Sequence, residues 1–186
     1  MESRMKQRIL RLSLFLLASL TLCFQTLNAD VIGKIPITTK GDADKTVEFT
    51  FPDGWFKNEE KNPFDLQYFS KSEQLTTAVF LYKKSDISSK YTARKLLDVH
   101  IKDLQSKRDK FEVLESERQI ESDNMNIISI VYSGEKGVSR NYYKLSAIEQ
   151  KKSSDAYLVV IQTIIPSQWD KRKTTLEDII KSARVK

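Results

Sequence analysis

The spacing of apolar residues after position 45 predicts three strands in the first half of the chain. In residues 46–51, TVEFTF, apolar and polar side chains alternate, which is the two-residue period of a half-buried strand. Residues 52–54, Pro-Asp-Gly, predict a turn, because a preset φ is followed by a residue that readily adopts positive φ. Strand patterns recur in residues 64–70 and 76–83.

The period then changes to that of a helix. In residues 88–107 apolar side chains recur every three or four positions, with Lys and Asp between them. The two-residue rhythm returns in four further runs, and the short connections between the last three predict antiparallel pairing. These runs are residues 111–120, 125–133, 141–150 and 156–165. A closing amphipathic helix is predicted from Thr174, with Glu177 in the spacing of a capping box.

Strands, a helix, more strands and a last helix predict an α+β domain in which helices cover an antiparallel sheet. The chain has 186 residues. After the first 29 of them we find no repeat, low-complexity tract or Pro/Gly-rich linker. We therefore expect one globular domain over residues 46–186, preceded by an extended lead-in over residues 30–45.

The first 29 residues have the composition of a secretory signal peptide. Residues 1–11 carry four cations and one acid, and the run from Leu12 to Phe24 is uncharged. This run is shorter than the ~20 residues that a spanning helix needs, so we expect no transmembrane segment. Cleavage is predicted after Ala29. The mature protein is then expected in the periplasm or outside the cell.

Cys23, the only cysteine, lies near the end of the uncharged run. An acylated cysteine normally follows a small residue and precedes polar ones, whereas Leu22 and Phe24 flank this one. We interpret Cys23 as part of the cleaved peptide and not as a lipid anchor. Without it, disulfides, thiolate metal sites and a cysteine nucleophile are excluded from the mature chain.

The formal net charge of +6 falls to +3 without the leader, because the leader carries four cations and one acid. The remaining lysines are interspersed with acids. Such a distribution does not fit a nucleic-acid-binding surface, and export argues against one as well.

Three stretches resemble the PsbP-like superfamily, which includes photosystem, Ran-binding and bacterial periplasmic proteins. They are FPDGWF at 51–56, the strand pair YYKLSAIEQKKSSDAYLVVIQT at 142–163, and SQWDKRK at 167–173. The resemblance extends over most of residues 46–185. It implies an antiparallel sheet of about six strands between helices. It also implies a docking or assembly role in place of enzymatic activity. We predict no cofactor.

We find no arrangement typical of a catalytic or metal site. His100, the only histidine, falls on the apolar side of the first predicted helix, so we interpret it as structural. Ser133 to Lys136 imitates the Ser-x-x-Lys of penicillin-recognising enzymes, but the flanking rhythm predicts a hairpin. Four acids that could have offered paired carboxylates are interpreted as a solvated face: Glu115, Glu117, Glu121 and Asp123.

The two tryptophans pose a choice between core and contact. Trp55 is predicted to pack the end of the sheet. Trp169 is followed by three cations just ahead of the positive end of the last helix, where cations are unfavourable. Those cations are either solvated or bind an acidic protein partner. We take the binding residues to be Trp169, Lys171, Arg172 and Lys173.

We therefore expect an exported, non-enzymatic protein that binds another protein or assists assembly of a complex in the cell envelope. The alternative is a carrier of a small apolar or lipid-like ligand, held between sheet and helix. A hydrolase has the least support from the sequence.

Overall fold

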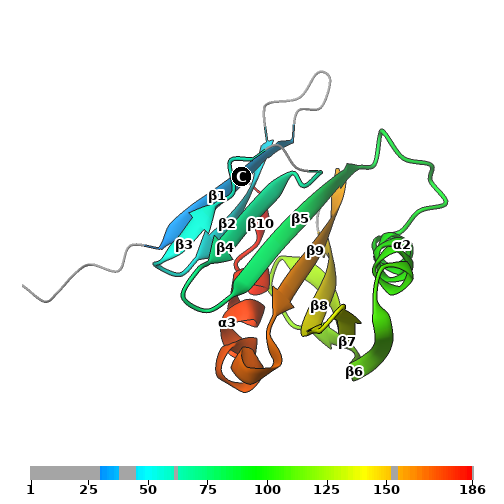
Figure 1. The fold of residues 1–186 in the computed structure, drawn as a ribbon. Coiled ribbons are helices and arrows are strands. Elements are labelled where there is room, and N and C mark those ends of the chain that lie inside the picture. Colours follow the sequence, from blue (N-terminus) through cyan, green and yellow to red (C-terminus); the bar gives the residue numbers. More distant parts are fainter. Residues whose placement is uncertain (1–29, 38–44, 61–62, 152–154, 186) are drawn as a thin grey trace, which may run out of the picture. The chain divides into compact units, whose positions relative to one another are not determined.

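A computed structural model describes residues 30–37, 45–60, 63–151 and 155–185 (Figure 1). The leader predicted for residues 1–29 lies outside the described residues. In chain order the elements are β1 (Val31–Ile37), β2 (Lys45–Phe51), β3 (Trp55–Lys57), β4 (Leu66–Ser70), β5 (Leu75–Lys83), α2 (Ala93–Ser106), β6 (Asp109–Ile120), β7 (Met125–Lys136), β8 (Ser139–Gln150), β9 (Ala156–Ile164), the 3₁₀ turn η1 (Pro166–Gln168), α3 (Trp169–Lys181) and β10 (Arg184–Val185).

Seven strands form one antiparallel sheet in the order β3-β4-β5-β9-β8-β7-β6. Strands β1, β2 and β10 form a second, smaller sheet. The α+β prediction is confirmed, as is the hairpin over the Ser-x-x-Lys stretch, where β7 ends at Lys136 and β8 begins at Ser139. Both sheets are antiparallel throughout. The long strands β7, β8 and β9 are neighbours in chain order, as the predicted meander requires.

The predicted lead-in contains a strand that sequence analysis missed. β1 pairs antiparallel with β2, and Gly33 lies opposite Phe49. A Cβ atom at Gly33 would come within 2.8–2.9 Å of the side chains of Phe51, Leu66 and Tyr68. Glycine is needed at this position because the apolar side chains of the neighbouring strands approach the backbone closely.

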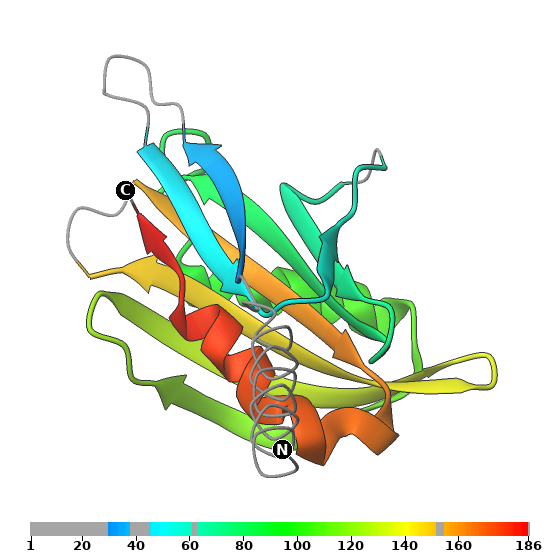
Figure 2. The same cartoon turned by 90° about the vertical axis from the view of Figure 1, so that its left-hand side faces the viewer.

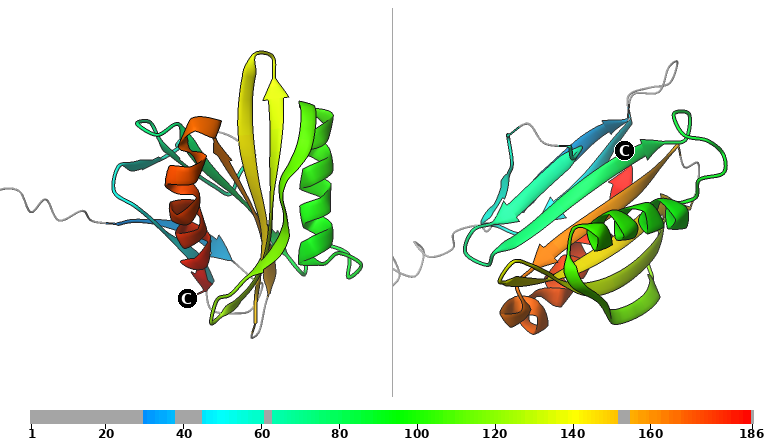
Figure 3. Two further views of the ribbon diagram at one scale, coloured as in Figure 1. Left: turned by 90° about the horizontal axis from the view of Figure 1, so that it is seen from below. Right: turned by 45° about the vertical axis from the view of Figure 1, so that its right-hand side comes forward.

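The two faces of the large sheet are covered by different elements. Helix α2 packs on one face, mainly against β8 and β9, with Leu97, Leu145 and Val159 fully buried. Helix α3 and the smaller sheet cover the other face, where Phe49 and Leu176 are buried. Figure 3 shows the large sheet between the two helices. Neither α2 nor α3 has the length and apolarity needed to cross a membrane.

The last helix begins five residues earlier than predicted. Pro166 starts η1, and this turn leads into α3 at Trp169 (Figure 2). The capping-box prediction for Thr174 and Glu177 is therefore wrong, because both residues lie inside the helix. Proline favours the first position of a helix, so the start signal was Pro166. Glu177 therefore lies in the middle of α3, and its side chain points toward the sheet.

Candidate functional site

A row of polar side chains crosses the α3 face of the large sheet. On each strand its members lie on the same side as the apolar core residues, where alternation predicts an apolar side chain, and all of them are buried. They are Ser129 on β7, Ser146 and Lys144 on β8, Gln162 on β9 and Thr77 on β5. Pairing places Ser129 opposite Ser146 and Gln162 opposite both Lys144 and Thr77. The row is therefore continuous across four strands.

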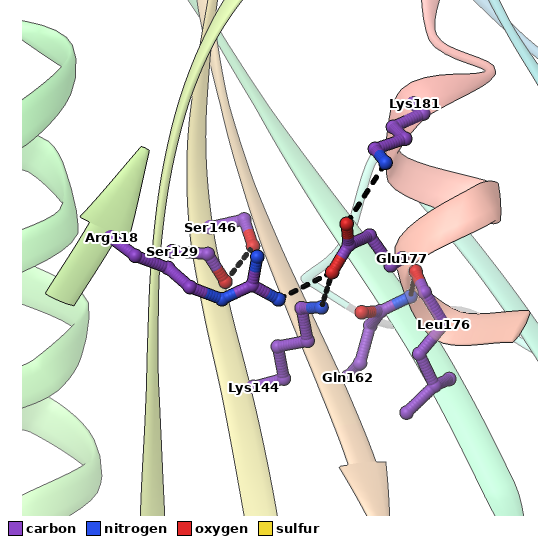
Figure 4. Close-up of polar contacts among 8 residues, drawn as sticks. All are labelled: Arg118, Ser129, Lys144, Ser146, Gln162, Leu176, Glu177 and Lys181. Carbon is purple, nitrogen blue, oxygen red and sulfur yellow. Dashed lines mark hydrogen bonds and ion pairs between the residues drawn. The ribbon is translucent and has the colours of Figure 1, made fainter. Parts of the chain in front are cut away.

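Hydrogen bonds connect parts of this row to each other and to α3. Ser146 Oγ donates to Ser129 Oγ at 2.9 Å. Gln162 Nε2 donates to the backbone carbonyl of Leu176 at 2.9 Å, so the amide ties β9 to α3 (Figure 4). Gln162 Oε1 has no hydrogen-bond partner among the described residues. Buried polar groups usually cost stability unless such bonds are made.

Lys144 is the largest polar member of the row, and 2% of the residue is exposed. Its Nζ lies 3.5 Å from Oε2 of Glu177 on α3. The same carboxylate pairs with Arg118 of β6 and, at 2.9 Å, with Lys181 one helical turn further along α3. Figure 4 shows the three cationic side chains converging on Glu177 from β6, β8 and α3.

The charges of this cluster are coupled. Burial alone would raise the pKa of the Glu177 carboxyl, but hydrogen bonds from Arg118 and Lys181 and the charge of Lys144 outweigh it and lower the pKa from 4.5 to about 2. Burial also lowers the pKa of the Lys144 ammonium, and Glu177 opposes that change. Glu177 is therefore ionised at neutral pH and does not exchange protons there.

A pocket of about 460 Å³ opens beside this cluster. Four cations and three carboxylates line it, and one of the cations, Lys173, is also paired with Asp170 outside the lining. The lining consists of Arg118, Lys144, Lys173 and Lys181, then Glu115, Glu177 and Asp178, and finally Trp169 and Thr174.

An irregularity in β6 brings two of the charged lining residues to the same side. Glu115 pairs with Val131 and Arg118 with Ser129, and the register shifts between them. In a regular strand, residues three apart point to opposite faces, whereas a bulge with one extra residue returns them to the same face. The bulge thus directs both Glu115 and Arg118 toward α3.

The four residues taken from the sequence as binding residues form the first turn and a half of α3. Trp169 is 6% exposed and meets Tyr142 edge to face at 6.0 Å between ring centroids. Arg172 pairs with Glu73, and Lys173 Nζ lies 2.9 Å from Asp170. Lys171 is exposed and makes no ion pair within the described ranges. Trp169 and Lys173 contribute to the pocket, whereas Lys171 and Arg172 do not line it.

Sequence analysis did not identify Arg118, Lys144, Glu177 or Lys181 as site residues. A signal was present for Lys144, which stands with Ser146 in the same phase of its strand as Tyr142 and Ile148. A lysine in phase with buried residues indicates a buried cation that needs an acidic partner. The partner itself lies on a distant helix, and local sequence does not identify it.

The other candidate residues occupy structural positions. His100 is buried, its Nε2 lies 2.7 Å from the Tyr82 hydroxyl, and its ring packs on Phe80. Burial lowers its pKa, so the imidazole is neutral at pH 7. Trp55 is buried in the core, as predicted. Within the described ranges no group of three or more His, Cys, Asp or Glu side chains is placed to hold a metal ion.

No protein-family profile and no curated protein sequence matches the chain. The solved structures that resemble it include the following three. PsbP (CyanoP) of Synechocystis is 16% identical, with a TM-score of 0.59 over 87% of this chain and 96% of that one. LpqN of Mycobacterium tuberculosis is 12% identical, with a TM-score of 0.57 over 83% and 91%. The Ran-binding protein Mog1p of Saccharomyces cerevisiae is 13% identical, with a TM-score of 0.52 over 83% and 96%. The chain has the PsbP/Mog-like fold that its sequence motifs implied.

Proposed function

We propose that this protein is an exported, non-enzymatic protein-binding factor that assists assembly in the cell envelope. The observation that carries the proposal is the pocket beside α3, which is lined by the buried Trp169, the partly exposed Arg118 and several other charged side chains. Arginine is enriched where proteins bind one another. Two proteins of this fold support the same class of role, since Mog1p binds Ran and LpqN is involved in cell envelope biogenesis.

The charge state of the pocket supports binding over catalysis. A general acid or base works best when its pKa lies near the working pH. The Glu177 carboxyl, with a pKa of about 2, lies far below neutral pH. Lys144, Arg118 and Lys181 are engaged with it in ion pairs. The fixed charge of Glu177 can help to orient a bound group without transferring a proton.

The packing between the two sheets favours protein binding over the alternative of a lipid carrier. The space there is lined by apolar side chains including Val47, Met125 and Leu158, and its volume is about 20 Å³. That is room for about one water molecule. A lipid-like ligand does not fit there, and the pocket between the sheet and α3 is lined mostly by charged side chains.

Export is proposed from the signal-peptide composition of residues 1–29. We expect mass spectrometry of the protein from its native host to find a chain that begins at Asp30 and carries no lipid. A diacylated or triacylated Cys23 at the amino terminus would overturn this part of the proposal.

Site-directed photo-crosslinking in the intact envelope tests the binding role. A photoreactive amino acid at Thr174, an exposed residue of the pocket lining, should crosslink to one envelope protein. The matched control is Val99, which is 51% exposed on α2, on the opposite side of the sheet. Equal products from the two positions, or no product from Thr174, would contradict the proposal.

The exposed cation Lys171 provides a second test of the same contact. If the partner surface is acidic, Lys171→Glu should mainly slow association with the crosslinked protein, because an exposed charge at an interface rim acts on the association rate. Lys102→Glu on α2 is the matched control and should leave association unchanged. The same rate in both variants would remove the first turn of α3 from the interface.

A further inference from the structure

We propose that the pocket beside α3 binds a carboxylate group of the partner polypeptide and that Lys144 is its principal contact. The assignment of the carboxylate to a polypeptide, as an acidic side chain or a chain end, rests on the proposed protein-binding function. The binding chemistry follows from the pocket alone.

The Lys144 ammonium is buried but only loosely paired. It carries three N–H donors, and 2% of the residue is exposed. Among the described residues its one ion-pair partner is Glu177, whose nearest oxygen lies 3.5 Å away. Charge-assisted hydrogen bonds between nitrogen and oxygen are usually about 2.7–2.9 Å long. A second carboxylate that approached closely would offset the cost of burying this cation.

The charge of the pocket favours a monoanion. Glu177 is shared by three cations, Arg118, Lys144 and Lys181. Lys173 is paired with Asp170 outside the pocket, so three cations and three carboxylates remain in the lining. These carboxylates repel a phosphate dianion more strongly than a single carboxylate. We therefore choose a carboxylate over a phosphate.

The exposed side chains of the pocket provide a route to Lys144. The side chains of Arg118 and Lys181 are 46% and 42% exposed, and both reach the Glu177 carboxylate that Lys144 faces. A guanidinium has several N–H donors arranged in a plane, so Arg118 can bind Glu177 and an incoming carboxylate together. Trp169 also lines the pocket and is therefore a reporter of its occupancy.

Nuclear magnetic resonance of the two indole N–H groups tests the inference on the purified protein. The chain has two tryptophans, of which Trp169 lines the pocket and Trp55 does not. Titration with N-acetylglycine, a monocarboxylate, at constant ionic strength should shift the Trp169 resonance saturably and leave Trp55 in place. N-acetylglycinamide, which has no charge, should shift neither. A Trp169 resonance that does not move with N-acetylglycine would overturn the inference.

Variants connect the binding to Lys144. Lys144→Met should weaken N-acetylglycine binding at least about tenfold, as expected when a buried charged contact is removed. Lys102→Met on α2 should not change it. If Lys144→Met does not fold, Arg118→Gln at the exposed edge of the pocket serves instead and should weaken binding several-fold. Unchanged affinity in a folded Lys144→Met or Arg118→Gln protein would contradict the inference.

Inorganic phosphate distinguishes the two anion classes. We expect it to shift the Trp169 resonance less than N-acetylglycine does at the same concentration. Tighter binding of phosphate would overturn the choice of carboxylate. The outcome is separable from the proposed function, because crosslinking from Thr174 with no N-acetylglycine binding would leave a protein-binding surface without a carboxylate site.

Discussion

The two faces of the seven-stranded sheet are both covered by an amphipathic helix, yet they bury different side chains. On the α2 side the buried residues of the described chain are apolar or aromatic, with His100 as the exception. On the α3 side a lysine, a glutamine, two serines and a threonine cross the sheet beneath the helix. The α2 face serves stability through apolar burial, whereas the α3 face buries charge that apolar packing does not require.

This difference has an energetic consequence. A buried ion pair contributes little net stability, because desolvation of the two charges offsets their attraction. Removal of one partner nevertheless costs much, since the other charge stays buried and unpaired. The ion pairs of the α3 face thus add little stability, although breaking them is costly. We therefore connect these charges with binding. Four predictions test the contrast between the faces.

The largest effect is expected for Glu177→Leu. Arg118 and Lys181 are partly exposed and can be solvated, but Lys144 would keep a buried charge without its partner. We expect a loss of about 3–5 kcal/mol in the free energy of unfolding, measured by urea denaturation. Glu112→Leu, an exposed site on β6, is the control and should change it by less than about 0.5 kcal/mol. A loss below about 1 kcal/mol for Glu177→Leu would show that Lys144 is not buried as a charge.

The second-largest effect is expected in the pH dependence of the unfolding free energy, through Glu177 on the α3 face. Because the folded pKa of Glu177 is about 2 and its ordinary value is 4.5, its contribution is complete above pH 4.5 and is lost as pH falls toward 2. The shift corresponds to about 3 kcal/mol. The difference in unfolding free energy between wild type and Glu177→Gln should therefore close across this range. Parallel curves down to pH 2 would contradict the assignment.

A smaller effect is expected on the α2 face. Burial lowers the pKa of His100 from 6.5, so its contribution is complete above pH 6.5 and declines as the pH falls below that value. His100→Gln should remove this slope and cost about 1 kcal/mol at pH 7 through the lost hydrogen bond with Tyr82. Partner crosslinking from Thr174 should stay within a few-fold. Complete loss of crosslinking in a folded variant would give His100 a role in function.

The smallest change in stability is expected for Lys144→Met. Glu177 would keep Arg118 and Lys181 as partners, and methionine fills a similar volume without a buried charge. We expect a change within about 1 kcal/mol in either direction, measured by urea denaturation. The double variant Lys144→Met/Glu177→Leu should recover most of the stability that Glu177→Leu loses. Without that recovery, the cost of Glu177→Leu would arise from packing and not from charge.

Local sequence determined most of the secondary structure. The central meander and helix α2 followed from apolar periodicity, because that period reports which side chains face the core. Strand β1 was missed because Gly33 stands in its buried phase and Pro36 near its end. The start of α3 was missed because a capping-box pattern at Thr174 and Glu177 outweighed Pro166. Both of these errors concerned a residue whose local preference had two interpretations.

Only the tertiary structure determined which residues form the pocket. The sequence places Trp169 and Lys173 close together, but Arg118, Lys144 and Glu177 come from β6, β8 and α3. Periodicity along one strand predicts the face on which a side chain lies and does not predict what packs against that face. Strand order, the β6 bulge and the path of α3 across the sheet set those neighbours. They arise from burial of the whole apolar surface at once, and that is a property of the assembled fold.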